Sequence, residues 1–230
     1  MRLNQSYSLN KFIEMLLAYF HNNKIEVGCD EAGRGCLAGP VFAAAVIFDQ
    51  NFSHSELNDS KKLSLTKRQQ LREVIEREAL AYAVAHVDPA EIDRINIHQA
   101  SYLAMHRALD SLILRPEFIL VDGNRFVPYR EIAHECIVKG DSKYLSIAAA
   151  SILAKTYRDD YMQEIAFGFP QYEWSRNKGY PTVSHRHAIL KHGLTPHHRL
   201  SFRVTDPRQT TNAAPNTSMI DAIKEIVSPK

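Results

Sequence analysis

The sequence feature that most constrains the fold is an apolar segment that ends in two adjacent carboxylates. Asp30 and Glu31 follow a run of mainly apolar residues that begins at Lys24, and a second apolar run, Val41 to Phe48, comes after a glycine-rich stretch. This pattern predicts a strand over 24–30, a turn and a second strand. Because successive side chains of a strand point to opposite faces, the two acids can serve one site only where the strand bends or ends.

The predicted turn places a glycine on each side of Arg34. Gly33 and Gly35 can adopt backbone conformations that other residues avoid, so the chain can bend sharply next to the acids. Carboxylates in such a turn suit hard cations, which take oxygen ligands. A solvated acidic turn is the usual alternative for an Asp-Glu pair, but the glycines and the apolar strands on both sides favour a functional site.

Composition limits the class of protein. The chain has 230 residues, 45% hydrophobic and 23% charged, with a net charge of +2, so any basic nucleic-acid surface must be local. Its three cysteines form no CxxC pair, which argues against a disulfide framework and favours a reducing compartment such as the cytoplasm. The apolar stretch Phe12 to Phe20 predicts a short amphipathic helix rather than a signal peptide. No apolar run is long enough to span a membrane.

Hydrophobic periodicity predicts alternating strands and helices along the chain. Helices are expected over 65–78, 96–114 and 143–167, and further strands over 80–87, 118–121 and 134–138. Ser64 or Thr66 is placed to cap the first helix, and Asn96 the second.

Two further acids follow predicted strands. Asp122 ends the wholly apolar strand 118–121, where a carboxylate at the carboxyl end of a buried strand favours a site, although Asp-Gly alone is equally typical of a hairpin turn. Asp141 precedes the long helix and could simply cap it. Asp159 competes with it, but it lies about 27 Å further along the helix axis and is spaced to pair with Lys155. We therefore choose Asp141 for the chemistry.

A segment whose charged residues are all basic lies near the C-terminus. Residues 176–205 contain no Asp or Glu, and Trp174 and Tyr180 lie in or beside them. This composition predicts a nucleic-acid surface. The segment's histidines match no zinc spacing, and no cysteine is near. They are His185, His187, His192, His197 and His198.

Four carboxylates brought together would repel one another strongly without a cation. Asp30, Glu31, Asp122 and Asp141 therefore predict a two-metal site, with ions about 3.5–4 Å apart, that acts on a phosphodiester. Together with the basic segment, this predicts a metal-dependent nuclease.

The chain resembles the bacterial ribonuclease HII family in a set of motifs that covers about residues 24–205. The matching motifs, in order, are Gly28-Cys29-Asp30-Glu31-Ala32-Gly33-Arg34-Gly35, Asp59-Ser60-Lys61-Lys62-Leu63, Ile95-Asn96-Ile97-His98-Gln99-Ala100, Val121-Asp122-Gly123, Lys139-Gly140-Asp141-Ser142-Lys143-Tyr144, Ser146 to Asp159, and Asn177-Lys178-Gly179-Tyr180-Pro181-Thr182. Any one of them alone is weak evidence, but as a set they are highly specific.

The resemblance implies an α/β fold with a ribonuclease H-like core, built from a mixed five-stranded sheet flanked by helices, plus a helical C-terminal part. The expected catalytic domain is 1–205, with its core over about 24–166 and a helical substrate-binding part over 167–205. We expect 206–230 to be a mobile tail. Asp30, Glu31, Asp122 and Asp141 would be the catalytic residues and the ligands of two Mg²⁺ or Mn²⁺ ions. The expected substrate-binding residues are Gly33, Arg34, Gly35, Lys61, Lys62, Lys143, Ser146, Lys178 and Tyr180.

The implied activity is endonucleolytic cleavage of the RNA strand of RNA–DNA hybrids. Such enzymes also cut on the 5′ side of ribonucleotides embedded in duplex DNA, leaving 3′-hydroxyl and 5′-phosphate ends, and we expect a monomer. Two alternatives stay open at this point, namely another nuclease or resolvase on the same core, and a non-catalytic hybrid-binding module. Cys36 stands where the family usually has proline, which we expect to loosen the turn without changing the ligands.

Overall fold

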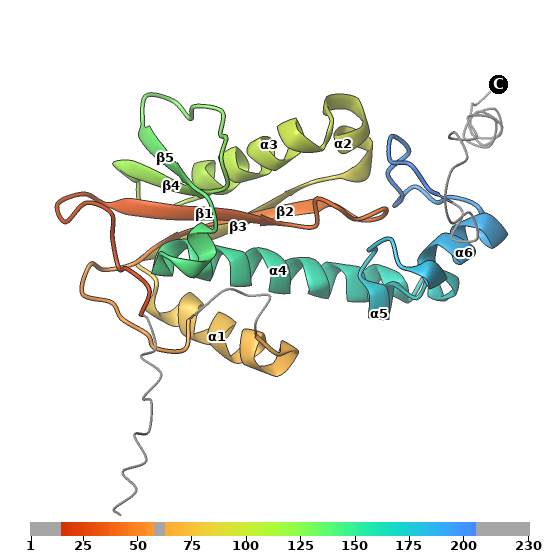
Figure 1. The fold of residues 1–230 in the computed structure, drawn as a ribbon, viewed down its shortest axis with the longest axis horizontal. Coiled ribbons are helices and arrows are strands. Elements are labelled where there is room, and N and C mark those ends of the chain that lie inside the picture. The colour runs from red at the N-terminus through yellow and green to blue at the C-terminus, as the bar shows by residue number, and fades with distance from the viewer. Residues whose placement is uncertain (1–14, 58–62, 206–230) are drawn as a thin grey trace, which may run out of the picture.

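The computed structural model of the protein describes residues 15–57 and 63–205 (Figure 1). The predicted substrate contacts Lys61 and Lys62 lie outside the described residues, as does the predicted tail 206–230.

The core is a mixed five-stranded sheet in the order β3-β2-β1-β4-β5. Strand β1 pairs antiparallel with β2 and parallel with β4, β2 pairs antiparallel with β3, and β4 pairs parallel with β5. The strands are β1 (Glu26–Ala32), β2 (Val41–Ile47), β3 (Ala81–Val87), β4 (Phe118–Asp122) and β5 (Ala133–Ile137). The predicted sheet is therefore confirmed.

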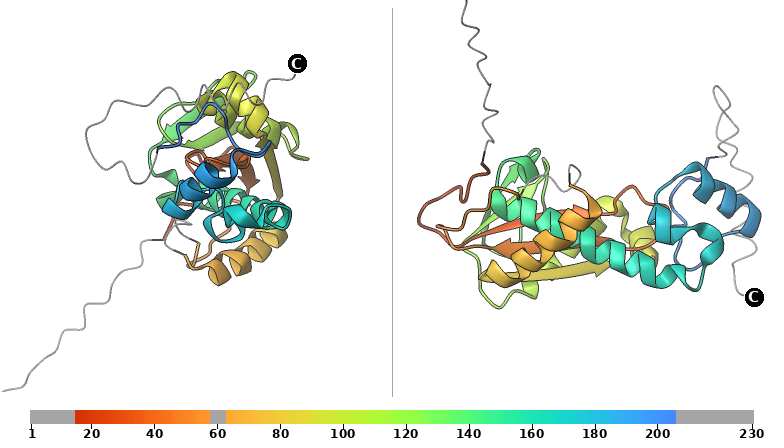
Figure 2. Two further views of the ribbon diagram at one scale, coloured as in Figure 1. Left: turned by 90° about the vertical axis from the view of Figure 1, so that its right-hand side faces the viewer. Right: turned by 90° about the horizontal axis from the view of Figure 1, so that it is seen from below.

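Helices cover both faces of this sheet (Figures 1 and 2). Helix α3 (Ile97–Asp110) packs on one face, preceded by the short α2 (Pro89–Ile95), and the long α4 (Leu145–Ala166) packs on the other, with α1 (Leu65–Glu78) against it. Apolar side chains fill the space on both faces of the sheet. Because β2 and β4 are covered on both sides, their sequences are almost continuously apolar, whereas β1 carries the acids Asp30 and Glu31 near its end.

The C-terminal part follows the far end of α4. The short elements η3 (Pro170–Tyr172), α5 (Trp174–Asn177) and α6 (Val183–His192) lie beyond the end of the sheet, as Figure 1 shows. They enclose a separate apolar cluster around Trp174 and Tyr172, to which Met162 of α4 contributes. The predicted helical C-terminal part is present, in helices shorter than α1, α3 and α4 of the core.

The structure corrects the prediction of an N-terminal helix over residues 15–20, and the first residues of that prediction, 12–14, lie outside the described residues. Residues 15–20 contain no helix, and Leu17 instead forms a single parallel bridge with Tyr144. The Phe20 ring stacks on Phe118 with the ring centroids 5.8 Å apart. The apolar residues of this stretch therefore pack against the core individually rather than as one face of a helix.

Candidate active site

The first acid pair lies within β1 rather than after it, since this strand continues to Ala32. Gly28 and Asp30 face α4, whereas Glu31 faces α3, as the alternation of a strand requires. The pairing of β1 with β4 stops at Cys29 and Val121. Beyond that pair, the edge of β1 is open toward Asp122, and the carboxylates of both faces can reach a common space.

That space is a cavity of about 240 Å³, which we call the α4-side cavity. Its charged and polar lining comes from β1 and the turn after it, the end of β4, helices α1 and α4, and the C-terminal part. These residues are Asp30, Glu31, Arg34, Arg68, Asp122, Ser151, Lys155 and Tyr180.

Asp30 is the most buried carboxylate of the group, with 5% of its surface exposed. Burial raises the pKa of Asp30 well above its ordinary value, and the carboxylates of Glu31 and Asp122 raise it further. The Ser151 hydroxyl and the backbone N–H of Glu31 act in the opposite direction by hydrogen bonding to Asp30. The chemistry of this donor set, hard oxygens that repel one another, fits divalent cations.

Asp141 lies beside this group rather than in the cavity. It is buried in η2 (Gly140–Ser142), the turn that leads into α4, and the backbone N–H of Gly140 donates a 2.7 Å hydrogen bond to Asp122. Among residues 15–57 and 63–205, no three His, Cys, Asp or Glu side chains are set to hold a metal ion. The four-carboxylate metal site therefore stays a prediction.

Arg34 occupies the rim of the site. Its guanidinium donates to Glu31 at 3.1 Å and lies 3.1 Å from Nδ1 of His98. Gly33 has φ +94°, and a β-carbon there would lie 2.0 Å from Nε of Arg158, so only glycine fits. Arg34 is thus presented next to the acids by a turn that passes closely over a buried side chain.

Two buried arginines hold the turn between β1 and β2 against the C-terminal part. Arg158, with none of its surface exposed, donates to the backbone carbonyls of Pro40, Ala38 and Lys178. Arg199 donates to the carbonyls of Gly39 and Arg34.

The backbone of the same turn pairs directly with the Asn-Lys-Gly-Tyr motif. The N–H of Leu37 donates to the carbonyl of Gly179 at 2.8 Å. These contacts bring Gly33 and Arg34 to the same cavity as Tyr180, although about 145 residues separate them in the sequence.

A pair of buried histidines orients the backbone at Tyr180. Nδ1 of His185 lies 3.0 Å from the Tyr180 carbonyl, and its Nε2 accepts from Trp174 at 3.0 Å. Nδ1 of His198 accepts from the backbone N–H of Thr195, and its Nε2 lies 3.3 Å from His185. These partners assign both rings as neutral, and burial lowers the pKa of His198 to about 3.

This network corrects part of the prediction for the basic segment. His185, His198 and Arg199 are buried, as is Trp174, and they bind backbone and one another. These residues therefore cannot form part of a nucleic-acid surface. Some basic residues of this segment, such as Arg199, donate hydrogen bonds to buried backbone carbonyls, and others carry exposed charge.

The other predicted substrate contacts are spread around the site. Gly35 is exposed, Lys143 is exposed at the end of η2, and the Lys178 ammonium donates to Gln163 at 2.8 Å. Ser146 is buried against Gly28 and does not line the α4-side cavity. Among the predicted substrate contacts that the structure describes, Gly33, Arg34 and Tyr180 line the α4-side cavity.

Sequence reasoning missed three polar residues of the same cavity. Ser151 and Lys155 lie on successive turns of α4 and point to the face that packs on β1, and Arg68 comes from α1. Lys155 pairs with Asp159, as its spacing predicts, but this pair is largely buried rather than on the surface. The helical spacing of 151 and 155 beside the acid-bearing strand is the signal that could have found the first two.

Comparison with known proteins agrees with this arrangement. The family model described as Ribonuclease HII matches residues 27–205. A curated ribonuclease HII of Parabacteroides distasonis is 64% identical over 197 residues, which is 86% of this chain and 98% of that protein. The chain belongs to the ribonuclease HII family.

Solved structures support the same assignment at the level of the fold. The crystal structure of the ribonuclease H2 from Pyrococcus horikoshii OT3 is similar with a TM-score of 0.67 and 26% identity, covering 78% of this chain and 94% of that one. The structure of the PCNA:RNase HII complex from Archaeoglobus fulgidus has a TM-score of 0.63 and 25% identity, covering 84% and 99%. The fold is ribonuclease H-like, and the protein is a ribonuclease H, a hydrolase with endonuclease function. Within the described part of the chain, no helix is long and apolar enough to cross a membrane.

Proposed function

We propose that the protein hydrolyses the RNA strand of RNA–DNA hybrids and cuts on the 5′ side of ribonucleotides embedded in duplex DNA. The observation that carries this proposal is the meeting of Asp30, Glu31 and Asp122 with Arg34 and Tyr180 in one cavity. Carboxylates can hold the divalent cations used in phosphodiester hydrolysis, and the glycine turn lets the backbone approach a ribose closely. The 2′-hydroxyl, both donor and acceptor, is the group by which such a turn can distinguish RNA from DNA.

The proposed chemistry assigns Asp30, Glu31, Asp122 and Asp141 to hold two Mg²⁺ or Mn²⁺ ions with substrate bound. The raised pKa of Asp30, caused by burial and by its carboxylate neighbours, supports this assignment, since a bound cation relieves that repulsion. The four carboxylates would hold the cations, and the chemistry that such cations would supply there is activation of a water and neutralisation of the leaving oxygen, with 3′-hydroxyl and 5′-phosphate ends as products.

The remaining residues position the substrate in this proposal. Gly33 and Gly35 bring backbone groups to the ribonucleotide, and Tyr180, 38% exposed, packs beside the sugar on its 3′ side. Lys143 and Lys178 contribute positive charge near the phosphates. We assign the core to about residues 24–166 and the substrate-binding part to 167–205. We also infer that the protein acts as a monomer in the cytoplasm, where its free cysteines stay reduced.

The test is cleavage of a duplex that carries one ribonucleotide, in Mg²⁺ or Mn²⁺, by wild type and by Asp30→Asn. The wild type should cut only at the ribonucleotide and only with a divalent cation. Asp30→Asn removes ligand charge with little change of shape, so it should fold as well as wild type and lose cleavage. Calorimetric titration with Mn²⁺ provides a readout independent of activity, and the variant should bind more weakly. Cleavage by Asp30→Asn at the wild-type rate would contradict the ligand assignment.

A further inference from the structure

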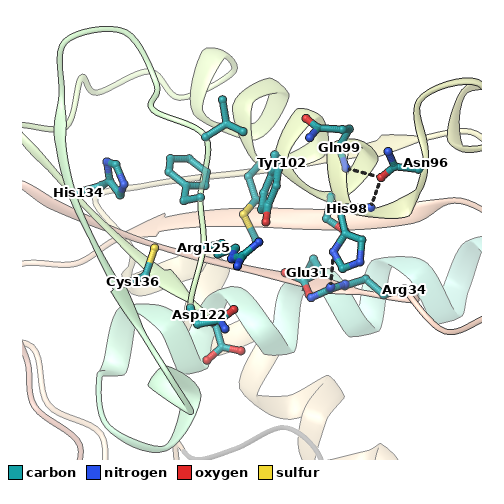
Figure 3. A pocket seen from close by; sticks show the side chains of 16 residues that line it. Glu31, Arg34, Asn96, His98, Gln99, Tyr102, Asp122, Arg125, His134 and Cys136 are labelled. Carbon is teal, nitrogen blue, oxygen red and sulfur yellow. Dashed lines mark hydrogen bonds and ion pairs between the residues drawn. The ribbon is translucent and has the colours of Figure 1, made fainter.

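A second and larger cavity adjoins the acids on the opposite face of the sheet. This α3-side cavity has a volume of about 910 Å³ and lies between α3, the end of β4 and residues 123–127 (Figure 3). It shares Glu31, Arg34 and Asp122 with the α4-side cavity. Most of its lining has no part in the function proposed above. Its volume falls within the range of about 300–1,000 Å³ that is typical of small-ligand sites.

The wall that residues 123–127 provide is held in place by side-chain contacts. The Phe126 ring makes edge contacts with Tyr102, His106 and His134, at centroid separations of 6.3, 5.3 and 5.3 Å. The next carbonyl along the chain, that of Val127, lies 3.0 Å from Nε2 of His106. Before Arg125, the backbone N–H of Gly123 donates to the carbonyl of Ile137 in β5 at 3.1 Å. The backbone on both sides of Arg125 is therefore anchored to the core.

Arg125 is the available cation of this cavity. Its side chain points into the space between Tyr102 and Asp122 in Figure 3. It forms no hydrogen bond or ion pair with any residue that the structure describes, whereas Arg34 at the other side of the cavity is bonded to Glu31 and His98. A guanidinium with all its donors available, carried on an anchored segment of backbone, is well suited to a phosphate.

The remaining lining suits a nucleotide rather than a bare anion. Tyr102 presents a half-buried aromatic ring next to Arg125, and Gln99 and Asn124 are exposed amides. Aromatic rings contact sugars and bases without sequence preference, and amides can donate to or accept from them. The combination matches one or two nucleotides of a strand.

The order of the two cavities gives that strand a direction. On the α4 side, Tyr180 is assigned to the nucleotide on the 3′ side of the ribonucleotide. Because both cavities meet at Glu31, Arg34 and Asp122, a strand whose scissile phosphate lies at the acids continues from one face of the sheet to the other. The nucleotides on the 5′ side of the scissile phosphate therefore reach the α3-side cavity.

We propose that the α3-side cavity binds the cleaved strand on the 5′ side of the scissile phosphate, with Arg125 contacting a phosphate and Tyr102 packing against the adjoining sugar or base. This inference rests on the proposed function, because that function supplies the strand and its direction. It adds a second substrate subsite and two specificity-determining residues.

The experiment compares two duplexes that each carry one ribonucleotide. In one, the cleaved strand extends ten nucleotides to the 5′ side of the ribonucleotide, a length on the order of one helical turn. In the other it begins one nucleotide before the ribonucleotide, so that the α3-side cavity has little to bind. The variants are Arg125→Gln and, as a matched control, Arg130→Gln, which lies nearby in the chain but pairs with Asp110 outside the cavity.

On the long duplex we expect Arg125→Gln to lower kcat/KM about tenfold, and Arg130→Gln to leave it within about twofold. On the short duplex wild type and Arg125→Gln should be equal within about twofold, because the contact is already absent. The slope of log kcat/KM against log salt on the long duplex should decrease by about one for Arg125→Gln, as expected for one lost phosphate contact. Tyr102→Ala should also lose about tenfold on the long duplex only, whereas Tyr102→Phe should retain the wild-type rate. Equal melting temperatures for wild type and Arg125→Gln would show that the variant is folded.

An equal loss for Arg125→Gln on both duplexes would overturn the proposal, because Arg125 would then act on the acids rather than on the strand. No loss on either duplex would overturn it as well. Failure of the proposed function gives a different result, since the wild type would then cut neither duplex at the ribonucleotide. If the wild type cuts both at that position and the variants do not distinguish them, the proposed function stands and this inference alone is wrong.

Discussion

Gly28 sets the distance between β1 and α4, and replacing it by alanine should displace the helix that carries Ser151. A β-carbon at this position would lie 2.3 Å from the carbonyl carbon of Ser146 and 2.4 Å from the amide nitrogen of Ile147. Ordinary van der Waals contact begins at 3.4 Å, so the backbone of α4 would lie about 1 Å too close to the new β-carbon. Both atoms belong to the backbone of a buried first turn, which cannot rotate away as a flexible side chain can.

Overpacking of this kind costs about 1–3 kcal/mol, and because the two nearest atoms belong to the backbone of α4, we place Gly28→Ala near 3 kcal/mol. In a chain of this size, 1 kcal/mol shifts the melting temperature by about 2–4 °C, so we expect a decrease of about 6–12 °C. Cleavage should also fall, because α4 moves Ser151 away from Asp30.

The assay is thermal and urea unfolding followed by circular dichroism, with Gly35→Ala as the matched control. A β-carbon at Gly35 would meet no atom within 4 Å, so that variant should stay within about 0.5 kcal/mol of wild type. If Gly28→Ala unfolded within 0.5 kcal/mol of wild type as well, the close approach of β1 and α4 would not be as the structure describes it.

Three further predictions concern the C-terminal part. Gly179→Ala should destabilise the protein and reduce cleavage, because this residue has φ +79° and its β-carbon would lie 2.4 Å from the Ala38 carbonyl oxygen. Gly168→Ala, whose β-carbon makes no such contact, is the control in the unfolding and cleavage assays. Tyr180→Ala should lose about tenfold or more in cleavage of a single embedded ribonucleotide and less on a long hybrid, and an equal loss on both together with a lowered melting temperature would assign this ring to packing instead. The urea concentration at the unfolding midpoint should fall as the pH drops from about 6.5 toward 3. The pKa of His198 is about 3 in the folded protein and near 6.5 in the unfolded chain, so the unfolded chain binds more protons between these values. His198→Gln should show a shallower pH dependence.

Elements with strong local signals were predicted closely. Helix α1 begins and ends where the sequence places it, and Ser64 caps it by accepting from the N–H of Lys67. Strand β4 is wholly apolar and ends at Asp122 as expected, because a strand buried on both faces has little other choice of composition. In these segments the residues that determine the structure are neighbours in the chain.

Predictions failed where the deciding contacts are distant in sequence. Helix α2, which is not among the predicted elements, is an exception because its signal is local: proline suits the first turn of a helix, and α2 begins at Pro89. The apolar N-terminal residues resemble a helix face, yet Leu17 and Phe20 pack separately against Tyr144 and Phe118. A local pattern does not identify a partner that comes a hundred residues later.

The buried arginines of α4 and of the C-terminal part illustrate the same limit most clearly at the site. A sequence shows that Arg158 and Arg199 are cations, but it does not show that their donors are taken by the carbonyls of the turn over 34–40 and of Lys178. Every residue has a backbone carbonyl, so an arginine that donates to carbonyls needs no acidic partner. The sequence therefore contains no residue that identifies such an arginine as buried. The buried guanidiniums nevertheless determine which distant motifs meet, since they hold the glycine turn against the segment that carries Tyr180. The cations that the fold itself uses therefore have to be set aside before the other basic residues are considered for substrate contact. Arg125, outside the basic segment, is one of those that remain.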